Sequence, residues 1–132
     1  MKITADTNVL IRAVVRDDEK QARAADRILR SAEIIAVTLP CLCEFFWVLR
    51  RLYKFDGRDI GAAIRSLADT ENVTLNRPAV EAGLAVLDAG GDFADGLIAY
   101  EGNWLHAETF VSFDKKAAAV LARLGYETRL LN

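Results

Sequence analysis

The segment KITADTNVLIRAVV, residues 2–15, decides the fold. Residues 2–5 form a short strand candidate that ends at residues 6–8, Asp-Thr-Asn, whose short polar side chains suit a turn or a helix cap. Residues 9–15 continue as a short helix or apolar stretch. The segment therefore predicts a strand that passes through a polar turn directly into a helix.

The same alternation of strand and helix patterns runs through the rest of the chain. Further strand candidates are residues 34–38, 73–75, 109–113 and 127–131, and helix candidates are residues 17–32, 40–53, 59–68, 78–87, 92–106 and 114–124. Strands separated by helices predict parallel pairing, with right-handed crossovers and helices on both faces of a central sheet. We expect one three-layer α/β/α domain over residues 1–132.

Composition excludes several classes of protein. With 132 residues, 52% of them hydrophobic and only 2 prolines, the chain is long and apolar enough for one compact core. No apolar run approaches the roughly 20 residues of a membrane-spanning helix, and Asp6 interrupts the amino-terminal stretch, so we expect a cytoplasmic protein with no membrane association. Two cysteines one residue apart and a single histidine exclude disulfide frameworks and Cys/His zinc sites.

The net charge of -2 provides no general attraction for nucleic acid. Binding a polyanion would need local help, and a bound divalent metal ion is one way to supply it.

The positions of the aspartates are informative. Asp6 and Asp114 each follow a predicted strand and precede a helix, while Asp92 and Asp95 begin one helix, three residues apart. The simplest interpretation is helix capping, and Asp92 with Asp95 resembles a capping box. However, the carboxyl ends of strands in an open α/β sheet form the usual ligand crevice, where Asp6 and Asp114 would meet. Carboxylates gathered there repel one another unless a cation lies between them, and oxygen ligands favour magnesium or manganese.

Glu44 is unusual because its predicted helix is apolar on nearly every side. The apolar stripe of this helix consists of Leu42, Phe45, Phe46, Leu49 and Leu52. A buried glutamate among such neighbours is costly without a partner. The alternatives are a rim position that reaches water, or an ion pair with Arg51 or a nearby lysine.

Four segments resemble the PIN domain family: ADTNVLIR (5–12), CEFFWVLRR (43–51), DFADGLIA (92–99) and FVSFDKKA (110–117). The resemblance covers essentially the whole chain and is greatest for the VapC-type toxins of bacterial and archaeal toxin–antitoxin pairs. It implies a Mg²⁺- or Mn²⁺-dependent endoribonuclease in which water attacks the phosphodiester, leaving 5′-phosphate and 3′-hydroxyl ends. It also implies a cognate antitoxin and a homodimer, with Trp47 a candidate for the dimer interface.

The resemblance assigns catalytic, metal-binding roles to four acids of this chain. Asp6 and Asp95 would be the principal ligands, while Glu44 would complete the cluster and orient or deprotonate the attacking water. Asp114 would bind a second ion or hold the cluster in place. The sequence adds Asp92, which we interpret first as a cap and second as an accessory ligand.

Polar neighbours are expected to support these acids. Thr7 and Asn8 would hold Asp6 by hydrogen bonds, and Ser112, where the family often has threonine, would supply a polar contact. Gly96 stands where related sequences often have alanine, which weakens the start of that helix.

Basic residues near these acids either flank an RNA strand or belong to an ordinary charged surface. They are Arg12, Arg16, Arg50, Arg51, Lys54, Lys115 and Lys116. Two other functions stay open for such a chain: a housekeeping RNA-processing PIN nuclease, and a catalytically silent PIN fold that binds RNA or protein.

Overall fold

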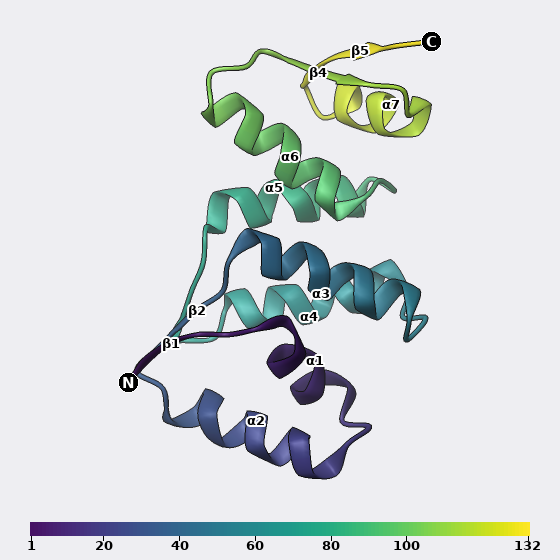
Figure 1. The fold of residues 1–132 in the computed structure, drawn as a ribbon. Coiled ribbons are helices and arrows are strands. Elements are labelled where there is room, and N and C mark those ends of the chain that lie inside the picture. Colours follow the sequence, from purple (N-terminus) through teal and green to yellow (C-terminus); the bar gives the residue numbers. More distant parts are fainter. The chain divides into compact units, whose positions relative to one another are not determined.

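The computed structural model describes residues 1–132, which divide into two compact units, Met1–Asn76 and Arg77–Asn132 (Figure 1). The first unit consists of β1 (Lys2–Thr4), α1 (Thr7–Val15), α2 (Glu19–Ser31), β2 (Ile34–Ala36), α3 (Leu39–Arg51), α4 (Gly57–Ala68) and β3 (Val73–Thr74). The second consists of α5 (Arg77–Asp88), α6 (Phe93–Trp104), β4 (Thr109–Ser112), α7 (Lys115–Arg123) and β5 (Glu127–Leu130).

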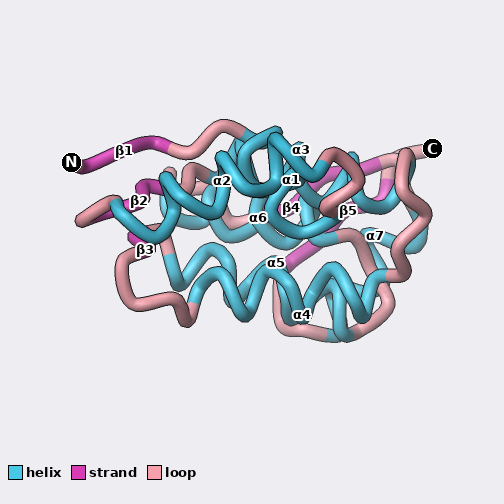
Figure 2. Tube along the Cα trace, turned by 90° about the horizontal axis from the view of Figure 1, so that it is seen from below, coloured by secondary structure: helices cyan, strands magenta, loops and turns pink.

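The first unit is built on a three-stranded parallel sheet in the order β1-β2-β3. Figure 2 shows the three short strands together, in magenta. Ile3 pairs with Ile35, and Ile35 pairs in turn with Val73. α1 packs against both α2 and α3, and the apolar faces of the unit's helices form its core. Its fully buried large side chains are Ile11, Ile35, Leu42, Phe45, Leu49, Ile60 and Ile64.

The second unit joins a helix pair to a β–α–β segment. β4 and β5 are parallel, with Thr109 opposite Glu127, and α7 connects them. A small core of Val86, Ala99, Val120 and Leu121 lies between α5, α6 and α7.

The crossing of α5 and α6 is unusually close (Figure 1). A methyl group added to Gly96 would lie 2.6 Å from the carbonyl oxygen of Ala82 and 2.6 Å from the Cα atom of Gly83. Only a residue without a side chain fits between these backbones. Gly96 therefore does more than weaken its helix, because it permits α6 to approach α5.

The predicted α/β class with parallel strands is confirmed, and each predicted strand and helix appears within two residues of its expected limits. The sheet differs in one respect: the strands form a three-stranded and a two-stranded ladder instead of one continuous sheet. Each ladder joins strands that are consecutive in sequence, and such pairs have the shortest loops to close. The longest helices have 13 residues, and none is long and apolar enough to cross a membrane.

Candidate functional site

Asp6 lies at the carboxyl end of β1, at the N-cap position of α1. Its backbone is extended, as at most N-caps, yet its carboxylate accepts no capping hydrogen bond. The first turn is closed instead by the backbone, with the Val9 amide donating to the Asp6 carbonyl oxygen at 3.1 Å. The carboxylate is thus available for a ligand, and capping does not account for it.

Glu44 is exposed, although its helix is largely apolar. Leu42, Phe45 and Leu49 form the buried stripe of α3, and Glu44 lies outside that stripe. The cost expected for burying this glutamate therefore does not arise, and it occupies the rim position. Glu44 and Asp6 both line a cavity of about 400 Å³.

Thr7 and Cys41 form a hydrogen bond beside this pair of acids. Thr7 is the only buried polar residue, at 5% exposure, and its Oγ1 donates to Cys41 Sγ at 3.7 Å. Burial raises the pKa of the Cys41 thiol, the charges of Asp6 and Glu44 raise it further, and the hydrogen bond from Thr7 opposes them. The thiol stays protonated at neutral pH and acts as a neutral acceptor.

The polar neighbours expected around Asp6 are placed differently from the expectation. The Thr7 hydroxyl bonds to Cys41 and not to the Asp6 carboxylate. Asn8 is exposed and lines a second cavity, of about 300 Å³, with side chains of α1 and α2. Sequence reasoning missed Cys41 as a partner of Thr7, although its position three residues before Glu44 was a signal that both lie near one side of α3.

The second unit contains the other acids. Asp92 caps α6 through a bond from the Ala94 amide at 3.0 Å, so the capping box expected between Asp92 and Asp95 does not form. Asp95, in the first turn of α6, is half-buried and caps nothing. Burial raises the pKa of Asp95, and the charges of Asp92 and Asp114 raise it further. Its ionised form is therefore held at a cost that a nearby cation would reduce.

Asp114 combines a capping role with a place near Asp95. Its Oδ1 accepts from the amides of Lys116 at 2.9 Å and Ala117 at 3.1 Å, which anchors the start of α7. Its own amide donates to Ser112 Oγ at 2.9 Å, which places Ser112 directly beside it. Both capping bonds use one oxygen, so Oδ2 has no part in the cap.

Each unit brings two of the four acids near each other and forms no larger acidic cluster. In neither unit do three or more His, Cys, Asp or Glu side chains gather closely enough to hold a metal ion. The first unit brings Asp6 and Glu44 to one cavity, and the second places Asp114 where its charge acts on Asp95.

Several basic residues expected to flank RNA are engaged within the chain. Arg12 donates to Gln21 Oε1 at 2.6 Å and pairs with Asp17 at 3.0 Å. Arg16 forms two bonds to Asp26, at 3.0 and 2.9 Å, and this contact lowers the pKa of Asp26. Arg51, Lys54, Lys115 and Lys116 are exposed. These four side chains are therefore better placed to contact a polyanion than Arg12 and Arg16, which are held by other side chains.

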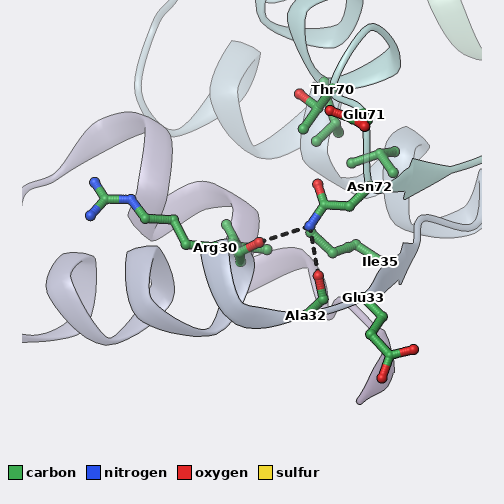
Figure 3. A pocket seen from close by; sticks show the side chains of 10 residues that line it. Arg30, Ala32, Glu33, Ile35, Thr70, Glu71 and Asn72 are labelled. Atoms are coloured by element: carbon green, nitrogen blue, oxygen red, sulfur yellow. Dashed lines mark hydrogen bonds between the residues drawn. The ribbon is translucent and has the colours of Figure 1, made fainter.

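A larger cavity lies elsewhere, at the amino ends of β2 and β3 (Figure 3). It measures about 610 Å³, and Asn72 at its wall donates to the carbonyl oxygens of Leu29 at 3.1 Å and Ala32 at 3.0 Å. Because the strands are parallel, the amino ends of β2 and β3 lie at the opposite end of the sheet from Asp6, which follows the carboxyl end of β1. The cavity is lined by the end of α2, the end of α4 and the starts of β2 and β3, and it is separate from the acidic pair.

Comparison with known families identifies a PIN domain. The family model described as PIN domain matches residues 3–120, which include residues of both units and all four acids. No curated protein matches the chain.

Proposed function

Because the chain belongs to the PIN domain family, whose members are generally nucleases and typically bind divalent metals, we propose that it is a Mg²⁺- or Mn²⁺-dependent endoribonuclease. The observation that carries the proposal is the state of Asp6. Its carboxylate follows the carboxyl end of a parallel strand, accepts no capping bond and shares a cavity with Glu44. Such strand ends are the usual ligand position in α/β sheets.

We propose further that residues 1–132 act as one PIN domain and that Asp6, Glu44, Asp95 and Asp114 are its metal-binding residues. The match to the family model on both sides of the boundary at residue 76 supports this proposal. Carboxylate oxygens are the donors that hard divalent ions prefer, and the raised pKa of Asp95 is the signature of a carboxylate that a cation would stabilise. A divalent ion bound there would make an attacking water more acidic and neutralise charge developing on the phosphate.

Under this proposal, each of the acids and their polar neighbours has a separate role. Asp6 and Asp95 are the principal ligands, and Glu44, exposed at the cavity, orients the attacking water or accepts its proton. Asp114 keeps Oδ1 on the start of α7 and offers Oδ2 to the site. Ser112 holds the backbone of Asp114 through its hydroxyl. Thr7 supports the site through Cys41, while Asn8 is left to contacts outside the acidic pair.

As a finer assignment, we propose a VapC-type toxin of a type II toxin–antitoxin pair, acting on RNA in the cytoplasm as a homodimer. The similarity of the four acidic segments to that subfamily supports it. A cognate antitoxin would block the acids, for example by inserting a basic side chain. Reversing that basic charge on the antitoxin is expected to relieve inhibition, and unaltered inhibition by every such variant would contradict the blocking scheme.

The test compares wild type with Asp6→Asn, which keeps the side-chain shape and removes the charge. Asp59→Asn is the matched control, because Asp59 is an exposed aspartate in the first turn of α4. We expect RNA cleavage with Mg²⁺ or Mn²⁺ by wild type and Asp59→Asn, no cleavage with EDTA, and none by Asp6→Asn. Metal-dependent cleavage by a folded Asp6→Asn variant would refute the metal site.

Induced expression in bacteria separates the remaining functions. Growth arrest by wild type and not by Asp6→Asn supports a toxin. Cleavage in vitro without arrest indicates a housekeeping nuclease, and RNA binding without cleavage indicates a silent module.

A further inference from the structure

The contact between Thr7 and Cys41 joins two segments that lie 34 residues apart in sequence. It is a side-chain hydrogen bond between α1 and α3, which pack against each other. Thr7 is buried, and its hydroxyl has the sulfur as its partner. A buried hydroxyl left without a partner is costly, so the pairing fixes which part of α3 lies beside the start of α1.

Each partner is adjacent to one of the acids. Thr7 directly follows Asp6, and Cys41 precedes Glu44 by three residues, which is close to one helical turn. All four residues line the same cavity of about 400 Å³. The hydrogen bond therefore connects the backbone that carries Asp6 to the helical turn that carries Glu44.

The size of sulfur sets the spacing of this connection. The Oγ1–Sγ distance of 3.7 Å exceeds the roughly 2.7–2.8 Å of a hydrogen bond between hydroxyl oxygens. In a serine at position 41, the Cβ–Oγ bond would be shorter than the Cβ–Sγ bond of cysteine. The hydrogen bond from Thr7 Oγ1 would also have to be shorter, so α1 and α3 would have to approach each other. Alanine would leave the Thr7 hydroxyl without a partner. The spacing of the two acids thus depends on a thiol at this position.

We propose that Cys41 is a positioning residue, which holds Asp6 and Glu44 at their working separation by accepting the hydrogen bond of Thr7. The inference rests on the proposed function, because that separation matters only if both acids bind one metal ion. It assigns Cys41 no contact with RNA or metal.

The experiment measures Mn²⁺ affinity of the metal-free protein by isothermal titration calorimetry, and separately kcat and KM for RNA. Its variants are Cys41→Ala, Thr7→Val and the double variant, with Cys43→Ala as the matched control two residues along the same helix. We expect each single variant to weaken Mn²⁺ binding about 3- to 10-fold and to lower kcat with KM little changed. The double variant should be no weaker than the singles, because both remove one interaction.

Two results would overturn the inference. One is a folded Cys41→Ala variant with wild-type Mn²⁺ affinity and kcat while Asp6→Asn loses both, which would leave the proposed function intact. The other is a double variant whose loss is the product of the single losses. If Cys41→Ala fails to fold, Thr7→Val, which keeps the shape of threonine, answers the same question. Absence of Mn²⁺ binding by wild type would overturn the proposed function and this inference together.

Discussion

Replacing Gly96 with alanine tests the close crossing of α5 and α6. The new Cβ atom would lie 2.6 Å from two backbone atoms of α5, about 0.8 Å short of the 3.4 Å at which ordinary contact begins. Backbone atoms cannot rotate away as a side chain can, so the helices must separate. The clash costs about 3 kcal/mol, the upper part of the range for overpacking, because both contacts are with backbone.

Helix propensity acts in the opposite direction. Alanine is about 1 kcal/mol better than glycine inside a helix, so the net free energy of unfolding should fall by about 2 kcal/mol. For a chain of this length we expect a melting temperature lower by about 6 to 10 °C. Thermal and urea unfolding followed by circular dichroism at 222 nm would measure both quantities.

Gly102 provides the matched control within the same helix. A methyl group there meets no atom within 4 Å, so Gly102→Ala gains the propensity term alone. Its free energy of unfolding should rise by up to about 1 kcal/mol, and its melting temperature should rise with it. Opposite signs for the two substitutions are the expected result. If Gly96→Ala is as stabilising as Gly102→Ala, the reasoning from the close crossing is refuted.

Two further predictions concern the acids of the second unit. The pKa of Asp95 is higher in the folded protein than in the unfolded chain. Ionisation of Asp95 therefore destabilises the fold as the pH rises from the ordinary aspartate range through the raised pKa. We expect Asp95→Asn to be more stable than wild type at pH 7, and the difference to shrink towards acid pH. Urea unfolding across pH would measure it, and a difference that grows on acidification would contradict the assignment. Asp114→Ala should lose about 1 kcal/mol from the two capping bonds, whereas Asp114→Asn keeps the capping oxygen and the stability but loses metal-dependent cleavage. Equal stability of the alanine variant and wild type would show that the cap contributes nothing.

The sequence predicts the elements well because their signals are local. Apolar spacing, polar turns and β-branched runs are sufficient to locate β1, α3 and α7 within two residues. The parallel pairing follows from their alternation. The break between β3 and β4 as separate ladders does not follow, because no local pattern states which non-consecutive strands exchange hydrogen bonds.

The roles of the acids are less accessible to sequence. Asp6 and Asp114 occupy the same kind of N-cap position, with extended backbones, yet only Asp114 uses its side chain for capping. That difference lies in side-chain torsion and neighbouring amides, which the sequence does not encode visibly. The exposure of Glu44 depends on the width of the buried stripe of α3, and the need for Gly96 depends on a neighbour from another helix.

The pairing of consecutive strands also determines the point in translation at which each sheet can form. All strands of the first sheet have been synthesised once residue 74 is added, and the second sheet draws only on residues 109–130. Neither sheet depends on a strand from the opposite end of the chain: paired residues such as Lys2 and Ile34 lie 32 positions apart, Ile35 and Val73 lie 38 apart, and Thr109 and Glu127 lie 18 apart. Asp114 belongs to the last segment to emerge. Under the proposed assignment, a nascent chain holds Asp6 and Glu44 early but lacks a complete set of acids until translation is nearly finished.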